Sequence, residues 1–155
     1  MFCCCFRKRY YDFSVEHTQP VIVKQNVVPT ECNDIYLKDS DISCIHIHDC
    51  MRIEIINCPR ITAIPSIKLY QQLETLILRY CNIETYRGHI PDCLRTIEIS
   101  YCGLREFAPE NMPHNLASLD LSFNKLKEIP RVLENVRGQI NLKNNDFWFN
   151  MYSDI

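Results

Sequence analysis

Apolar and polar positions alternate in a fixed pattern that is clearest between residues 115 and 130. Leu116, Leu119, Leu121 and Leu126 surround Asn124, and the residue between Leu119 and Leu121 is polar. A short apolar–polar–apolar run predicts a strand with one buried face. A single unit of this kind cannot cover its own apolar face, so it requires copies stacked on both sides.

The copies are present at regular intervals. The second apolar residue of each pair is Leu37, Ile55, Leu78, Ile99, Leu121 and Leu142, which gives intervals of 18, 23, 21, 22 and 21 residues. Three residues further on, the chain has Ser40, Cys58, Cys81, Cys102, Asn124 and Asn145, a position that we name the turning slot. A further apolar residue follows each slot: Ile42, Ile61, Ile83, Leu104, Leu126 and Phe147. Starting a unit at Ile47 instead of Ile55 would give intervals of 10 and 31, so we prefer Ile55.

The unit fits the pattern L-x-x-L-x-L-x-x-N/C-x-L and resembles the leucine-rich repeat family. The resemblance implies an α/β-type solenoid, a right-handed coil with a parallel sheet on its concave face. It also implies that the residue in the turning slot bonds the backbone of neighbouring coils. Prolines in the return arms, among them Pro91, Pro109 and Pro130, leave little room for long helices. We therefore expect mostly extended or 3₁₀ convex arms, with one helical turn near residues 131–136.

The pattern divides the chain into four parts. We expect a cysteine-rich and basic segment at residues 1–12, an N-terminal cap at 13–33, about six coils at 34–147 and a C-terminal cap at 148–155. The β-branched run from Val21 to Val23 predicts a short strand or hairpin that shields the first coil. Phe147, Trp148, Phe149 and Tyr152 are expected to close the other end of the core, with an aromatic docking site as the alternative.

Composition excludes several classes of function. The net charge of −2 argues against non-specific nucleic-acid binding, and three glycines cannot build a glycine-rich phosphate loop. The sequence also lacks a nucleophile elbow and a zincin helix. Glu98 and Asp120 in adjacent coils were weighed as an acid/base pair, but a shallow sheet gives them no enclosure. We therefore predict a non-enzymatic protein with no cofactor and no small-molecule substrate.

Ten cysteines raise the question of disulfides and metals. Cys58, Cys81 and Cys102 occupy the turning slot, where a thiol serves as a small buried residue. With no secretion signal, this favours reduced thiols and an intracellular location. His46, His48, Asp49 and Cys50 lie too close together on one short segment to surround zinc, so we predict no metal site.

Cys3, Cys4 and Cys5 precede Arg7-Lys-Arg9 near the N-terminus. Acyl chains on these cysteines beside a basic patch would supply the two signals that stable membrane anchoring needs. Lipidation with tethering to the cytoplasmic face of a membrane is therefore one of two interpretations that stay open for these residues. The alternative is that the three cysteines pack under the first coil as part of a cap.

The outward residues of the strands and turns form rows across neighbouring coils. Glu98 and Asp120 are expected to form an acidic pair, and Ile56 with Ile77 an exposed apolar step. The predicted partner-binding residues on the concave face are Glu54, Ile56, Ile77, Arg79, Tyr80, Glu98, Ser100, Tyr101, Asp120, Ser122, Phe123, Asn141 and Lys143. Aromatic anchors surrounded by charges are typical of protein-binding surfaces. The alternative is that the aromatic row of Tyr80, Tyr101 and Phe123 consists of half-buried packing residues.

The sequence thus predicts a protein-binding module or adaptor. The alternative is a structural component of a larger assembly, such as a viral particle or virion, because the composition in Ile, Asn, Tyr and Cys resembles that of large DNA viruses.

Overall fold

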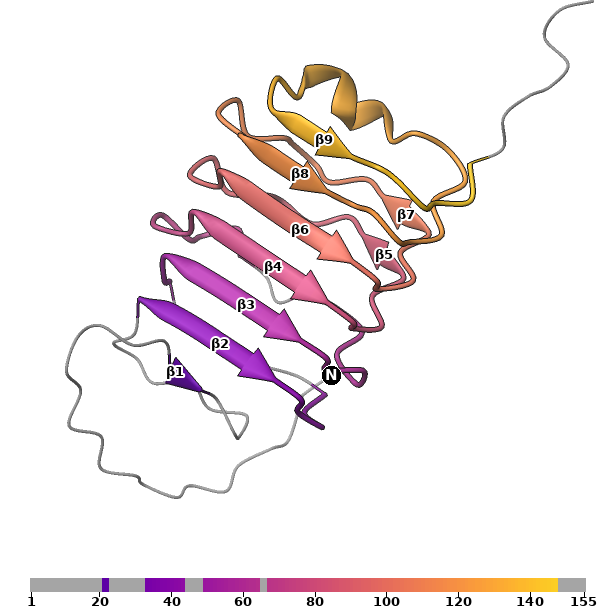
Figure 1. Ribbon diagram of the computed structural model, residues 1–155. Coiled ribbons are helices and arrows are strands. Elements are labelled where there is room, and N and C mark those ends of the chain that lie inside the picture. Colours follow the sequence, from indigo (N-terminus) through magenta and orange to yellow (C-terminus); the bar gives the residue numbers. More distant parts are fainter. Residues whose placement is uncertain (1–20, 23–32, 44–48, 65–66, 148–155) are drawn as a thin grey trace, which may run out of the picture.

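The computed structural model describes residues 21–22, 33–43, 49–64 and 67–147. Seven parallel strands lie side by side in one sheet. Figure 1 shows the chain passing behind the sheet between β4 and β6, between β6 and β8, and between β8 and β9. In sheet order the strands are β1 (Val21–Ile22), β2 (Asp34–Lys38), β3 (Arg52–Ile56), β4 (Thr75–Arg79), β6 (Thr96–Ser100), β8 (Ser118–Asp120) and β9 (Gln139–Asn141). The architecture is therefore a parallel β-solenoid.

The register of the strands confirms the predicted phase of the repeat. Leu37 pairs with Ile55, Ile55 with Leu78, and Leu78 with Ile99. Placing the second unit at Ile55 rather than at Ile47 was therefore correct. The predicted strand at Val21–Val23 is present as β1, which pairs in parallel with β2 and so does not form a hairpin with it.

The core is the strip of apolar side chains that the coils share. Leu37, Ile55, Leu78 and Leu121 have no exposed surface, and Ile99 is only 1% exposed. Because successive side chains of a strand point to opposite faces, each coil adds two residues to this strip and presents the intervening one outward. Stacked coils thereby bury the apolar face that a single coil leaves open.

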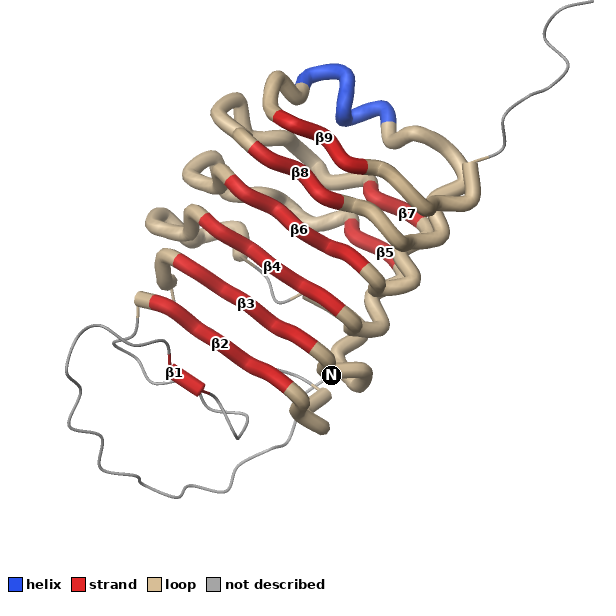
Figure 2. The backbone as a smooth tube through the Cα atoms, viewed as in Figure 1, coloured by secondary structure: helices blue, strands red, loops and turns tan. Residues whose placement is uncertain are grey.

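The return arms are mostly loop, drawn in tan in Figure 2. They contain β5 (Thr85–Tyr86), β7 (Glu106–Phe107) and one 3₁₀ helix, η1 (Arg131–Asn135), at the predicted helical turn. The described residues contain no α-helix, so they do not support the α/β label. Arms of this length punctuated by proline are too short and too poor in N–H donors for α-helices. The right hand of the coil and the concave shape of the sheet stay predictions.

The turning slot ties each coil to its neighbours. Asn124 accepts bonds at Oδ1 from the backbone N–H groups of Cys102 (3.0 Å) and Leu104 (3.1 Å) in the preceding coil. Its Nδ2 donates to the carbonyl of Ile99 (2.6 Å) and to two carbonyls of its own coil. These bonds confirm the predicted role of the slot. They stabilise the coil because a buried backbone group without a partner costs about 1–3 kcal/mol.

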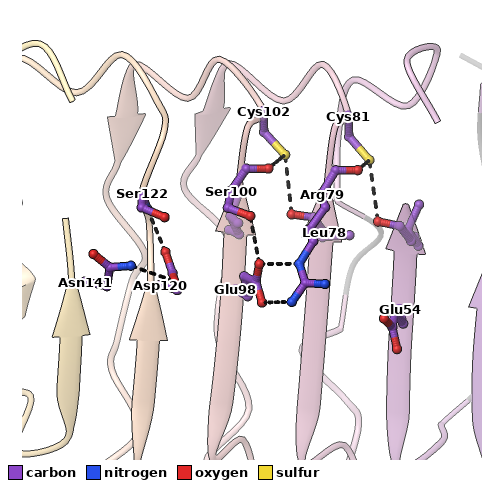
Figure 3. Close-up of polar contacts among 12 residues, drawn as sticks. Glu54, Leu78, Arg79, Cys81, Glu98, Ser100, Cys102, Asp120, Ser122 and Asn141 are labelled. Atoms are coloured by element: carbon purple, nitrogen blue, oxygen red, sulfur yellow. Dashed lines mark hydrogen bonds and ion pairs between the residues drawn. The ribbon is translucent and has the colours of Figure 1, made fainter. Parts of the chain in front are cut away.

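Cysteines in the turning slot also bond the backbone of their own and neighbouring coils, through weaker thiol hydrogen bonds. The Cys102 thiol donates to the carbonyls of Ser100 (3.2 Å) and Leu78 (3.5 Å), as Figure 3 shows. It also lies against the backbone N–H of Cys81, one coil earlier. A hydrogen bond with Cys102 and burial raise the pKa of the Cys81 thiol. A raised pKa keeps the Cys81 thiol protonated and therefore poor as a nucleophile.

The last described coil is less covered than the others. Ile140 is 39% exposed, whereas Ile97 and Leu119, its counterparts in the two preceding strands, are each 1% exposed. Gly138 is required where this coil begins, because a Cβ there would lie 2.4 Å from the carbonyl oxygen of Ala117. Terminal repeats differ from internal ones because one of their faces lacks a neighbouring coil.

Several predictions lie outside the described residues. They concern the segment 1–12 with Cys3–Cys5, all of the cap at 13–33 except β1 and residue 33, the histidines His46 and His48, and the cap at 148–155. Within the described part of the chain, no helix has the length and apolar character that a membrane span requires.

Candidate functional site

The strands bring the predicted outward residues together in rows. Glu54, Ile77, Glu98, Asp120 and Asn141 are in register, one on each of five neighbouring strands. We name the surface formed by the outward side chains of β2, β3, β4, β6, β8 and β9 the open sheet face. The repeat spacing therefore placed these residues correctly relative to one another.

Three of the predicted contact residues are not accessible on this face. Ile77 is only 7% exposed, so the predicted apolar step formed by Ile56 and Ile77 is not exposed at Ile77. Ser100 and Ser122 are 2% and 4% exposed. Their short side chains lie below their larger neighbours, so they position other groups rather than contact a partner.

Arg79 and Glu98 form a two-bond ion pair between adjacent strands (Figure 3). The guanidinium donates through Nε to one carboxylate oxygen and through Nη2 to the other, the second bond being 2.6 Å long. Ser100 Oγ donates to the same carboxylate at 2.7 Å. The hydrogen bond with Glu98 raises the pKa of Arg79. Glu98 is thus occupied as an acceptor, which argues against the acid/base pair with Asp120 that was considered from the sequence.

Asp120 is held differently. Its Oδ1 accepts the backbone N–H of Ser122 at 2.8 Å, and its Oδ2 accepts Nδ2 of Asn141 at 2.8 Å (Figure 3). Among the described residues, no Lys, Arg or His nitrogen lies within 4.0 Å of this carboxylate. Two neutral donors therefore fix the orientation of the Asp120 carboxylate, and Arg79 acts on it only beyond ion-pair distance.

Tyr80, Tyr101 and Phe123 stack on one another at the end of the strands and form what we name the aromatic ladder. Their ring centroids are 4.6 Å apart for Tyr80 and Tyr101, and 4.1 Å apart for Tyr101 and Phe123. The three side chains are 50%, 41% and 42% exposed. The rings therefore pack against one another on the surface and not into the core.

The ladder occupies a strained backbone position. All three aromatic residues have φ values near +54°, in the left-handed region that bulky residues rarely adopt. Three other coils place Asp39, Asn57 or Asn144 at this position, and Asp and Asn tolerate positive φ well. A strained non-glycine residue costs on the order of 1–3 kcal/mol. The fold alone therefore does not require aromatic residues here.

The ladder lies within electrostatic range of the acidic row. The pKa of the Tyr101 phenol is raised, first by lost hydration and then by Tyr80 and the negative charge of Asp120. Asp120, Tyr101 and Phe123 thus combine a fixed carboxylate with exposed aromatic surface. Such a combination recognises cationic and amphipathic side chains of another molecule.

One charged contact on this face was missed from the sequence. Arg52 donates to Glu54 through Nε (3.3 Å) and Nη2 (3.0 Å). The signal was present, because Arg52 and Glu54 are two residues apart on one strand and so point to the same face. The lining of a hollow open to solvent includes Arg52, Glu54, Asp34 and Tyr36.

The described part of the chain contains no group of three or more His, Cys, Asp and Glu side chains arranged to hold a metal ion.

The fold and this face define a repeat solenoid with an exposed, chemically mixed surface. Residues 115–136 match the family model of the leucine rich repeat. This match and the coil of parallel strands both fit a leucine-rich repeat protein. Comparisons with curated proteins and with solved structures gave no match.

Proposed function

We propose that this protein is a non-enzymatic binding module that contacts a protein partner through the open sheet face, with the aromatic ladder at the centre of the contact. The observation that carries the proposal is the ladder itself. Three large rings are exposed at positions where the backbone favours Asn or Asp. Backbone strain of this kind is found most often at functional sites, where it is retained despite its cost in stability.

The chemistry of the surroundings supports the same function. Interfaces are enriched in Tyr, Phe and Arg at their centre, and a few such residues carry most of the binding energy. Here the ladder member Tyr101 interacts electrostatically with Asp120, and Arg79 and Glu98 form an ion pair on the neighbouring strands. Leucine-rich repeat modules generally bind protein partners, and the family is typically non-enzymatic.

Site-specific photocrosslinking in native cells tests the proposal. A benzophenone amino acid replaces Phe123 in one variant and Leu69, an 84% exposed residue of the arm before β4, in a matched control. We expect a discrete crosslinked protein from position 123 that is absent from position 69. The crosslink at 123 should disappear when Tyr101→Ala and Glu98→Lys are added. Equal crosslinking from both positions, or a product that survives these two substitutions, would place the contact elsewhere.

Membrane tethering through Cys3, Cys4 and Cys5 is a separate proposal. It is supported by the three adjacent cysteines and the basic run at residues 7–9. A lipid label that is sensitive to hydroxylamine should be present on the full chain and lost from the Cys3–Cys5→Ser variant. A label that survives the substitution would overturn the proposal.

A role as a structural component of a larger assembly, including a viral one, is the second candidate. The partly exposed Ile140 at the last described coil favours it, because an uncovered apolar end suits a stacked neighbour. Size-exclusion chromatography separates the two: a monomer supports the binding module, and an obligate assembly supports the structural role.

A further inference from the structure

A diagonal pattern of contacts crosses the open sheet face. Arg79, at the end of β4, pairs in register with Ser100, at the end of β6. Its guanidinium nevertheless reaches back to Glu98, two residues earlier on the same neighbouring strand. A cation at the end of one strand thus neutralises a carboxylate in the middle of the next.

The next pair of strands repeats the acid but not the cation. Glu98 on β6 is in register with Asp120 on β8, so Asp120 holds the position in β8 that Glu98 holds in β6. Ser100 holds the position that would serve Asp120 as Arg79 serves Glu98. The Ser100 hydroxyl donates to Glu98. The serine side chain is neutral and too short to reach Asp120. The molecule therefore supplies the guanidinium for one carboxylate and omits it for the other.

The Asp120 carboxylate is prepared to accept such a group. Each of its oxygens accepts one hydrogen bond, from Ser122 N–H and from Asn141 Nδ2, which fixes the orientation of the carboxylate plane. An ionised carboxylate offers about four acceptor sites, so one remains on each oxygen. Two parallel acceptor sites match the planar fork of a guanidinium.

The aromatic ladder adds a second requirement. Tyr101 lies within electrostatic range of this carboxylate and stacks on Phe123, and the two rings are 41% and 42% exposed. A guanidinium stacks on aromatic rings, and its alkyl stem covers apolar surface, whereas an ammonium ion is compact and strongly hydrated. An arginine satisfies both the carboxylate and the rings better than a lysine does.

No cation of the described residues forms an ion pair with Asp120. Arg79 is held by Glu98, and Arg52 by Glu54. Lys143 follows β9 by two residues. Among the described residues it forms no ion pair with Asp120. The described residues therefore leave Asp120 open to a cation that a partner presents.

We propose that the open sheet face captures an arginine side chain of its protein partner, with the guanidinium on Asp120 and the stem along Tyr101 and Phe123. This inference rests on the proposed function and names the chemistry that the partner must present.

Selection of peptides from a random nonapeptide display library on the full-length protein tests it. Peptides are retained only if Tyr101→Ala abolishes their binding. The affinity of each is then measured with its arginine intact or replaced by glutamine, on the wild type and on Asp120→Asn. Asp92→Asn is the matched control, because Asp92 is an exposed acid outside the strands.

We expect an arginine in the retained peptides. Replacing it with glutamine should weaken binding to the wild type and to Asp92→Asn by about tenfold, the scale of one desolvated charged pair. On Asp120→Asn the same replacement should change the affinity by less than about twofold, because the two groups act as a coupled pair.

The outcomes separate the two proposals. Retained peptides that lack arginine, prefer lysine, or lose the same affinity on Asp120→Asn as on the wild type would overturn the arginine inference and leave the proposed function standing. If no selected peptide depends on Tyr101, the proposed function fails and the inference fails with it.

Discussion

Two columns run along the coils, one residue apart in the sequence and opposite in character. The turning slot, with Cys102 and Asn124, points inward and is buried, and the aromatic ladder, with Tyr101 and Phe123, stands just before it and is exposed. The side chains of the slot bond the backbone of neighbouring coils. The ladder residues have a positive φ and bond the next coil through their backbone N–H groups, from Tyr101 to Ser122 and from Phe123 to Lys143.

The difference separates what the fold demands from what it tolerates. A buried N–H or C=O must have a partner, so the slot accepts few residue types. The ladder position requires only a positive φ, which Asp39 and Asn57 provide in other coils. Aromatic residues there are therefore better explained by binding than by folding.

The largest effect is expected from the slot. Asn124→Ala leaves the N–H groups of Cys102 and Leu104 and the carbonyl of Ile99 without their partner. We expect the free energy of unfolding, measured in urea, to fall by about 3 kcal/mol or more, since each orphaned buried group costs about 1–3 kcal/mol. Lys125→Ala, an exposed neighbour, is the control and should change it little. Equal effects from the two variants would contradict the role assigned to the slot.

A gain is expected when a cysteine slot is given the chemistry of Asn124. Cys102→Asn places an amide where its oxygen can accept the backbone N–H groups of Cys81 and Ile83, by analogy with the coil that follows. The free energy of unfolding should rise by about 1 kcal/mol, the net worth of a typical hydrogen bond. Cys102→Ala, measured alongside, should be the less stable of the two. The reverse order would show that the two kinds of coil are not equivalent.

A smaller change is expected in the ladder. Phe123→Asn gives the position a residue that tolerates positive φ but removes one stacked pair, worth about 0.5–1.5 kcal/mol. Relief of backbone strain offsets this loss, so the free energy of unfolding should change by less than about 1 kcal/mol. The same variant should lose partner binding in a crosslinking or peptide assay. A loss of stability comparable to that of Asn124→Ala would make the ladder a structural feature.

The smallest effect is expected from the exposed ion pair. The side chains of Arg79 and Glu98 are 40% and 16% exposed, so solvent and salt screen their attraction. Arg79→Gln should lower the free energy of unfolding by about 0.5 kcal/mol, with a smaller difference at high salt. Thermal melts at two salt concentrations measure this, and an effect that does not depend on salt would point to packing rather than charge.

The accessibility of the face is the part that the sequence predicted least well. A repeat of about 22 residues fixes which residue of one coil lies next to which residue of another, and so the rows were correct. The repeat spacing does not determine how much the neighbouring side chains cover a given residue. Ile77 and Ser100 lie in outward rows yet are covered.

The sequence by itself determined the repeat, its phase and the shared apolar strip, because these depend on spacing and on which face each residue occupies. The hydrogen-bonding role of the turning slot was implied by the resemblance to leucine-rich repeats. Only the tertiary structure showed that Arg79 forms an ion pair with Glu98, whereas Asp120 has no ion pair among the described residues. It also showed that three aromatic rings stack at positive φ. Those outcomes depend on side-chain reach between coils, which residue spacing does not encode.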